Sequence, residues 1–226
     1  MFLKPMKRVL GCDDRMNSEG EWLQSWSQSS SADRIQYRTV LGDTWQHLCH
    51  RCRDGSWSKR NNPTYIDAVN GFSSFQEFSE WAVSKVGYGL IDERGNRYQL
   101  DKDILVPGNK VYSKDTCSFV PAKVNTVLLG RRPKMNGLPI GVRICSQTKR
   151  FSAQITMNQK NVFLGRFDSP LEAHAAWQRK KVEAIRSTAE WYRNADGFDA
   201  AVSAALIRRA DLIHDQVRAG IETREF

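Results

Sequence analysis

Three β-prone segments follow one another between Ile140 and Phe167, with the sequences IGVRIC, RFSAQITM and NVFLGRF. The intervening stretches SQTK and NQK are short enough for hairpin turns, so the segments are predicted to pair as a three-stranded antiparallel sheet. Asp168 or Ser169 then begins a predicted helix with Pro170 in its first turn. A sheet covered on one face by the following helix is an α+β unit, which we expect to span residues 137–193.

The alternation of side chains along a strand assigns the residues of this sheet to two faces. The apolar residues predicted to pack on the helix are Val142, Ala153 and Ile155. The polar residues predicted to face outward are Arg143, Gln154 and Thr156. Arginine and glutamine form bidentate hydrogen bonds to guanine and adenine edges in the major groove. The outward face therefore has the chemistry of base recognition.

The positive charge of the chain is concentrated in the same region. Residues 131–193 contain 13 Lys and Arg against four Asp and Glu, an excess of nine that equals the formal net charge of the whole chain. This distribution indicates an anionic partner, although a basic surface that contacts only solvent has the same composition. Phosphate contacts are expected from the basic residues at turns and strand ends: Lys149, Arg150, Lys160 and Arg166.

The stretch GVRICSQTKRFSAQITMNQKNVFLGRFDSPLEAHAAW resembles the ethylene-response-factor (ERF-type) DNA-binding domain over about residues 137–186. That family carries GVR, a basic–aromatic–x–Ala–x–Ile strand, LGxF and a helix that begins with an acid and Ala-Ala. The resemblance implies that the sheet contacts the major groove of double-stranded DNA through Arg143, Cys145, Gln154, Thr156, Asn161 and Phe163. The plant pattern has charged residues at positions 145, 154 and 156, so its base preference is not expected to transfer. The alternative is a small sheet–helix scaffold that binds protein.

Residues 40–130 are predicted to form a second unit, separated from the first by the basic stretch GRRPKMNG. Helices are expected at residues 40–53, where Asp43 or Thr44 would be the cap, at residues 73–86 and at residues 121–129. Ser73 or Ser74 would form a capping box with Glu77. Short strands are expected around QLDKDIL and CSFVP, and a loop at residues 54–70.

Residues 1–36 are predicted to be an extension of undetermined role. The stretch SWSQSSSADR is Ser-rich, which is typical of a loop or flexible linker. Trp22 and Trp26 stand four residues apart and are compatible with a short helix that docks on the core.

The ordered motifs TWQHLCHRC, FQEFSEW, QLDKDIL, GNKVYSKDTC and AKVN resemble a divergent phage branch of the HNH nucleases over about residues 44–129. The resemblance implies a ββα-metal fold in which Asp101 binds Mg²⁺ or Mn²⁺ and Asn125 is the second metal ligand. Lys102 falls at the position of the general-base histidine, and Thr116 at that of an asparagine that orders the loop. ERF-type domains often follow HNH modules in homing endonucleases, so each resemblance supports the other.

The missing histidine decides whether this site is catalytic. A general base works best with a pKa near the working pH, whereas lysine titrates near about 10.4. Lys102 would more readily hold a phosphate as a point charge. Asp103 would then take over as the base, or a metal-bound hydroxide would attack unaided.

A zinc site is an alternative for the cysteines and histidines of the first helix. The residues concerned are His47, Cys49, His50 and Cys52, with Cys117 as a possible third ligand. Zinc sites usually show two paired knuckles, and only one pair is visible here. We therefore expect Cys52 and Cys117 to be reduced core residues, and zinc to be absent.

A last helix is predicted within residues 197–222. One face of it carries Phe198, Val202, Leu206, Arg209, Ile213 and Val217. This stripe is expected to pack on the core of the protein, and the alternative is a homodimer contact.

The sequence thus predicts a site-specific DNA-binding protein, with a phage HNH-type homing endonuclease as the leading function. The alternatives are a catalytically inactive DNA-binding or regulatory protein and a protein-interaction adaptor that has no affinity for DNA. No apolar run approaches about 18 residues, so no membrane span is expected. The expected location is the cytoplasm, that of the host cell if a phage encodes the protein.

Overall fold

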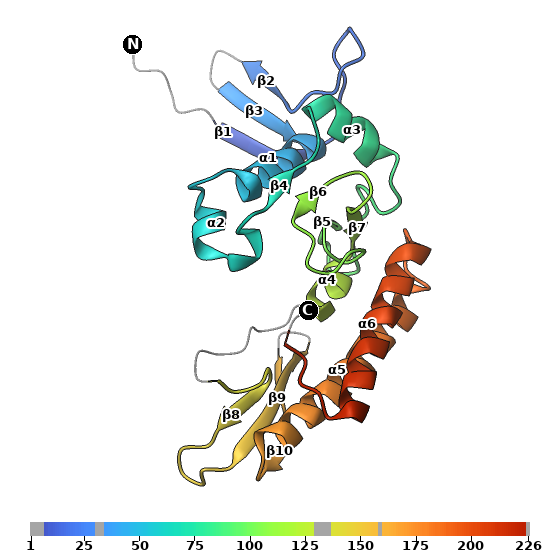
Figure 1. Cartoon of the computed structure of the whole chain (residues 1–226). Helices are drawn as coiled ribbons and strands as arrows, with labels where there is room; N and C mark the ends of the chain where they lie inside the picture. The colour runs from blue at the N-terminus through green and yellow to red at the C-terminus, as the bar shows by residue number, and fades with distance from the viewer. Residues whose placement is uncertain (1–6, 30–33, 129–136, 158–159, 225–226) are drawn as a thin grey trace.

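The computed structural model describes residues 7–29, 34–128, 137–157 and 160–224 (Figure 1). The architecture is α+β, as predicted, with several small sheets and six α-helices in the described ranges. The predicted boundary at GRRPKMNG lies outside the described residues except for Gly137. The N-terminal half occupies one end of the molecule and the C-terminal sheet the other, while two long helices run between them (Figure 1).

The N-terminal segment forms a sheet, which corrects the prediction of a loop and a short helix. Its strands are β1 (Lys7–Cys12), β2 (Ser25–Ser29) and β3 (Arg34–Thr39). Strand β3 lies in the centre, parallel to β1 and antiparallel to β2. Trp26 of β2 is paired with Tyr37 of β3, and their rings stack with centroids 4.0 Å apart. This cross-strand aromatic contact stabilises a strand that the serines alone do not predict.

The same segment is built into the unit that follows it. Thr39 caps helix α1 (Val40–Cys52): its hydroxyl accepts a hydrogen bond from the Gly42 amide at 3.0 Å and donates to the Leu23 carbonyl at 2.8 Å. The predicted cap was wrong, because the Asp43 carboxylate instead accepts a hydrogen bond from the Gly11 amide at 2.7 Å. A Cβ atom on Gly42 would lie 2.0 Å from the Gln24 carbonyl oxygen, so only glycine fits there.

Short elements occupy the stretch 54–70 that was predicted to be a loop. They are α2 (Trp57–Asn61), the 3-10 turn η1 (Pro63–Tyr65) and β4 (Val69–Asn70). Helix α3 (Phe75–Val83) begins as predicted: the Ser74 hydroxyl accepts from the Glu77 amide, and the Glu77 carboxylate accepts from the Ser73 amide at 2.7 Å. The predicted cap at Ser74 is therefore confirmed, while Glu77 closes the reciprocal bond on Ser73, one residue before the cap.

The region of the HNH resemblance contains two strands and a helix in the order of a ββα unit. Strand β5 (Gln99–Asp101) pairs antiparallel with β7 (Ser118–Val120), and α4 (Ala122–Leu128) follows directly. Between them β6 (Val111–Tyr112) pairs in parallel with β4. We call residues 99–128 the ββα unit.

The predicted C-terminal sheet is present. Its strands β8 (Val142–Ile144), β9 (Phe151–Met157) and β10 (Lys160–Phe167) are antiparallel with β9 in the centre. Helix α5 (Pro170–Tyr192) begins after its N-cap Ser169, and its N-terminal part covers one face of the sheet. The residues predicted to face this helix, Val142, Ala153 and Ile155, are all buried.

Helix α6 (Ala200–Ala219) packs antiparallel to α5, and both helices pack on the ββα unit. One hydrophobic cluster joins Ile104 and Val124 of the ββα unit to Ile185 of α5 and Leu206 of α6. Most of the predicted apolar stripe on the last helix thus packs against α5 and the ββα unit, as expected. The buried residues of this stripe are therefore not available for a homodimer contact. No helix in the described ranges combines the length and the apolar content needed to cross a membrane.

The α5–α6 contact predicts a matched pair of substitutions. Leu206→Ala removes a fully buried side chain at the junction and should lower the free energy of unfolding by about 2–5 kcal/mol. Leu212→Ala on the same helix, where the side chain is 53% exposed, should change it by less than about 0.5 kcal/mol. Urea unfolding followed by circular dichroism measures both. Equal effects of the two substitutions would contradict this packing.

Candidate nucleic-acid interface

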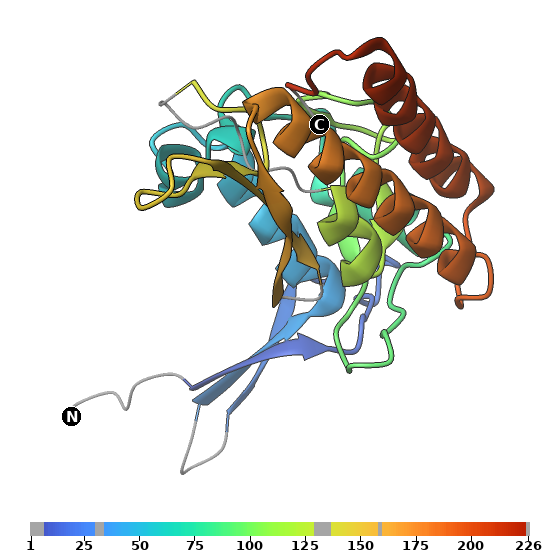
Figure 2. The same cartoon turned by 90° about the horizontal axis from the view of Figure 1, so that it is seen from below.

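The open face of the β8–β10 sheet brings together most of the predicted DNA contacts. Directly opposed residues in antiparallel strands project to the same face. The opposed pairs are Arg143 with Ser152, Ser152 with Arg166, Gln154 with Phe163, and Thr156 with Asn161. We call the side chains of these seven residues the outer face. Helices α5 and α6 both lie on the other side of the sheet (Figure 2).

The outer face combines hydrogen-bonding groups with an aromatic ring. Phe163 is 56% exposed, and the guanidinium carbon of Arg166 lies 5.8 Å from its ring centroid. The Thr156 hydroxyl donates to the Asn161 side-chain oxygen at 2.8 Å, which leaves the Asn161 amide hydrogens pointing elsewhere. Such a surface can donate to base edges and make apolar contact with a thymine methyl group.

The hairpin turn between β8 and β9 forms one edge of this surface. Lys149 adopts a left-handed conformation there (φ 57°), and its amide donates to the Cys145 carbonyl at 2.9 Å. A hydrogen bond from Thr148 lowers the pKa of the partly buried Cys145 thiol to about 7. Arg150 is half-exposed and forms an ion pair with Asp168 at 2.8 Å, so its charge is shared. Lys149 is thus better placed than Arg150 to contact a phosphate.

Gly141 sets the backbone conformation immediately before strand β8. Its φ of +81° lies in the left-handed region, and a Cβ atom there would lie 2.2 Å from the Trp177 ring of α5. The Gly141 carbonyl accepts a hydrogen bond from the Gln154 amide at 2.8 Å. The glycine of the GVR motif therefore allows β8, with Arg143, to lie directly against the helix.

In the ββα unit, Asp101 ends β5 and caps the turn that follows. One carboxylate oxygen accepts hydrogen bonds from the amides of Asp103 and Ile104 at 2.9 and 2.8 Å. Burial, followed by the charge of Asp103, raises the pKa of Asp101 to about 6. This carboxyl group changes charge close to neutral pH, which is a property of many catalytic acids and bases but also of structural carboxylates.

Lys102 does not occupy the place of a general base or of a phosphate contact. Its side chain is only 3% exposed, and its ammonium group forms an ion pair with the Asp103 carboxylate at 2.8 Å. The residue predicted to replace the base and the lysine predicted to bind phosphate are thus bound to each other. The Lys102 ammonium group is enclosed in the unit, whereas the side chain of Asp103 is still 34% exposed.

Asn125 faces β5 but contacts Gln99. Its side-chain amide donates to the Gln99 side-chain oxygen at 2.8 Å. Gln99 and Asp101 project to the same side of β5, so Asn125 and Asp101 lie on one side of the unit. No group of three or more His, Cys, Asp or Glu side chains suited to a metal ion occurs in the described part of the chain.

Arg51 is one cationic neighbour of Asp101, which also has the Asp103 carboxylate beside it. Burial lowers the pKa of the Arg51 guanidinium, but nearby Tyr112, Tyr65 and Asp101 outweigh it and raise the pKa above its ordinary value. Arg51 also donates to the Tyr112 hydroxyl at 3.4 Å. One Asp101 oxygen already caps the backbone, whereas a Mg²⁺ or Mn²⁺ site takes several oxygen ligands.

Asn109 is a residue that sequence reasoning missed. Its side-chain amide donates to the carbonyls of Lys102 and Val111, both at 2.7 Å, and so closes the loop between β5 and β6. Thr116, the residue at the expected loop-ordering position, donates to the same Val111 carbonyl at 2.8 Å. The PGN sequence at 107–109 is a turn signal that would have pointed to Asn109.

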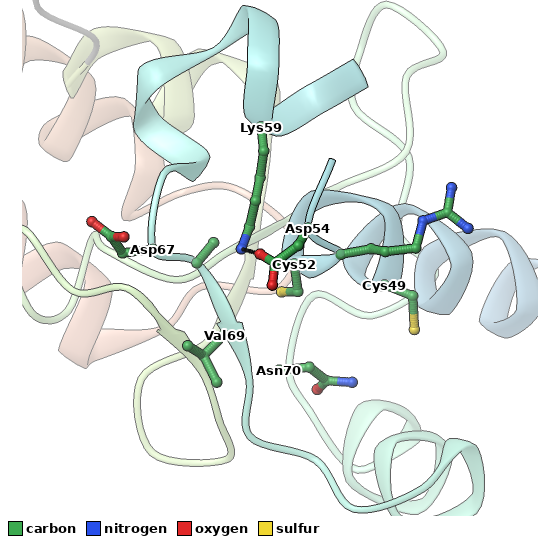
Figure 3. A pocket seen from close by; sticks show the side chains of 9 residues that line it. Cys49, Cys52, Asp54, Lys59, Asp67, Val69 and Asn70 are labelled. Atoms are coloured by element: carbon green, nitrogen blue, oxygen red, sulfur yellow. Dashed lines mark hydrogen bonds and ion pairs between the residues drawn. The ribbon is translucent and has the colours of Figure 1, made fainter. Parts of the chain in front are cut away.

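The alternative zinc ligands lie apart: Cys49 and Cys52 line a shallow pocket, Cys117 is buried, His47 is exposed and His50 contacts Ser58. Cys49 and Cys52 face an open cavity of about 600 Å³, in which Lys59 and Asp54 form an ion pair (Figure 3). Burial raises the pKa of Cys52 to about 11 and that of the buried Cys117 to about 12. Protonated thiols are poor metal ligands, which favours reduced cysteines.

The titration of Asp101 predicts an unusual pH dependence of stability. The folded state binds more protons than the unfolded state between the ordinary pKa of 3.8 and about 6, so stability should fall as the pH rises through this window. Asp101→Asn keeps the capping oxygen and should remove the fall, making the variant more stable than wild type at pH 7 by about 1–3 kcal/mol. Urea unfolding at pH 4 to 7 measures this. The exposed Asp115→Asn variant should follow the wild-type profile, and an Asp101→Asn variant that does the same would contradict the assignment.

Comparison of the chain with protein-family models, with curated proteins and with solved structures gives no significant match.

Proposed function

We propose that this protein binds double-stranded DNA in a site-specific manner through the outer face of the β8–β10 sheet. The observation that supports this most is the register of the sheet, which places Arg143, Gln154, Thr156, Asn161 and Phe163 together on one open face. Each of these side chains can contact a base edge or a thymine methyl group in the major groove.

The surrounding charge is consistent with this function. Among the basic residues behind this excess, Lys149, Lys160 and Arg166 lie on the sheet or its turns and would supply phosphate contacts, whereas those of α5 lie on the covered side. Lys149 lies at one edge of the outer face and Lys160 begins β10. Such contacts fix the position of the protein on the duplex, while the central residues of the sheet select the sequence.

We infer that the ββα unit is a scaffold within a catalytically inactive DNA-binding or regulatory protein. The support is the ion pair between the buried Lys102 and the partly exposed Asp103, which stands where the HNH resemblance expects a base. The second candidate is a metal-dependent endonuclease. It is favoured by the strand–strand–helix order and by the Asp101 carboxyl group with its raised pKa, and in it Asp101 and Asn125 would hold Mg²⁺ to stabilise charge on the phosphate.

Substitution of Arg143 tests base recognition. Arg143→Ala should weaken binding to a selected DNA site by about 1–3 kcal/mol and relax the preference at one base pair. Arg208→Ala removes an exposed charge on α6, on the other side of the molecule, and should leave that preference unchanged. The measurement is in vitro site selection followed by fluorescence anisotropy. If both variants keep wild-type affinity and preference, the outer face does not bind DNA.

A plasmid-relaxation assay distinguishes the inactive-scaffold proposal from the endonuclease proposal. Wild-type protein should bind supercoiled DNA without nicking it in the presence of Mg²⁺ or Mn²⁺, because the two candidate bases Lys102 and Asp103 are paired with each other. Nicking that is lost in Asp101→Ala but kept in Asp115→Ala would establish the endonuclease and remove the scaffold proposal. An affinity that stays constant between about 50 and 200 mM salt would instead favour a protein-interaction adaptor, since phosphate contacts are strongly salt-dependent.

A further inference from the structure

His174 joins three parts of the C-terminal half at one buried point. It lies in α5, and its side chain is 1% exposed. Its Nδ1 atom lies 2.8 Å from the Ile140 carbonyl oxygen, immediately before β8. Its Nε2 atom lies 3.0 Å from the amide nitrogen of Thr223, in the segment that follows α6. The two contacts connect the beginning of the sheet, its covering helix and the C-terminal segment.

These two partners require a single protonation state of the ring. A carbonyl oxygen only accepts hydrogen bonds, so Nδ1 must carry a hydrogen. A backbone amide only donates, so Nε2 must present its lone pair to Thr223. Only the neutral imidazole with its hydrogen on Nδ1 satisfies both. Protonation of Nε2 would place two donors against each other and break the bond to Thr223, while the bond to Ile140 would remain.

The C-terminal segment Ile221–Arg224, which we call the strap, is held by few other bonds. Gln178 of α5 donates to the Ile221 carbonyl and to the Thr223 hydroxyl, both at 2.9 Å. The Thr223 hydroxyl in turn donates to the Gln216 side chain of α6. Gln178 and Thr223 are both buried, so the strap covers polar groups that would otherwise meet water. Among these contacts, the hydrogen bond from the Thr223 amide to His174 is the one that protonation of the ring would break.

We propose that His174 is a positioning residue that fastens the strap to α5 behind the DNA-binding sheet only while its ring is neutral. Uptake of one proton releases the strap and admits water to His174, whose Nδ1 atom holds the Ile140 carbonyl ahead of β8, and the hydrated contact loosens the strand that carries Arg143. The release of the strap is independent of DNA, whereas the consequence for binding rests on the proposed function.

The direction of the pH effect follows from the surroundings of the ring. Burial lowers the pKa of His174 below its ordinary value of 6.5, while the Ile140 carbonyl and Glu222 of the strap partly oppose this. The neighbours from the sheet, Ile140, and from α5, Trp177 and Gln178, are uncharged, so Glu222 is the charged group described near the ring. The strap is therefore fastened above pH 6.5 and released as the pH falls through the folded-state pKa, and Glu222 limits how far below 6.5 this lies.

The first test follows the strap itself in the whole protein. Nuclear magnetic resonance of ¹⁵N-labelled protein reports the tautomer of His174 and the exchange rate of the Thr223 amide hydrogen. We expect the Nδ1–H tautomer at pH 7.5. We also expect protection of the Thr223 amide to fall, after correction for intrinsic exchange, by up to about tenfold per pH unit once the ring titrates. The Nε2–H tautomer, or protection that does not change down to pH 4.5, would overturn the proposal.

Matched variants separate the switch from a merely structural role. His174→Gln offers an NH₂ donor group and an oxygen acceptor but does not titrate, so its strap should stay protected at acid pH. Thr223→Pro removes the amide donor and should leave the strap released at every pH, whereas Thr223→Ser keeps the donor and should behave as wild type. A wild-type pH profile in His174→Gln would contradict the switch even if all variants fold.

The DNA-binding consequence has its own readout. The ratio of affinities at pH 7.5 and 5.0, measured by anisotropy on one duplex, should be several-fold larger for wild type and Thr223→Ser than for His174→Gln. Equal ratios would overturn the coupling to the sheet. If no variant binds DNA at either pH, the proposed function fails and the coupling with it, and the exchange data alone decide whether His174 fastens the strap.

Discussion

The arrangement of the molecule depends on helix α5, which packs against two separate structural units along its length. Near its beginning Ala173 and Trp177 pack on the β8–β10 sheet. Further along, Ile185 and Ala189 pack with α6 and the ββα unit. Because α5 is one continuous helix, it fixes the orientation of the outer face of the sheet relative to the ββα unit. A partner bound on the outer face would therefore meet the N-terminal half in a defined orientation.

The junction also contains buried charge, which a purely apolar contact would avoid. Burial and the charge of Arg209 lower the pKa of Lys181 to about 8. Burial lowers the pKa of Arg209, and the charge of Asp103 partly opposes this. Asp103 thus lies between Lys102 on its own loop and Arg209 on α6. Such buried charges rarely add stability over an apolar core, but they discriminate strongly against a wrong docking, in which one charge would lose its counter-charge.

The sequence was informative where structure depends on neighbours in the chain. The three strands from Val142 to Phe167 are joined by tight turns, so the alternation of Val142, Ala153 and Ile155 with polar residues was enough to predict both faces. The capping box of α3 and the N-cap Ser169 are local for the same reason. The N-terminal sheet was missed because β1 pairs in parallel with β3 across more than twenty residues, and a parallel pairing leaves no turn signal. Tyr37, the ring that stabilises Trp26, likewise lies on a different strand.

The candidate site shows the same division between local and non-local information. The order β5–β7–α4 was predictable, because each element has its own apolar pattern and Pro121 precedes the helix. The burial of Lys102 was not predictable, because residues distant in sequence form its environment. A lysine so little exposed requires a counter-charge, and Asp103 supplies it while also facing Arg209 of α6. A histidine at position 102 would not need this pair at neutral pH. Lys102 therefore pairs with Asp103, and the charge of Asp103 also acts on Arg209, so the loop after β5 is coupled electrostatically to the long helices and through α5 to the sheet that is proposed to bind DNA.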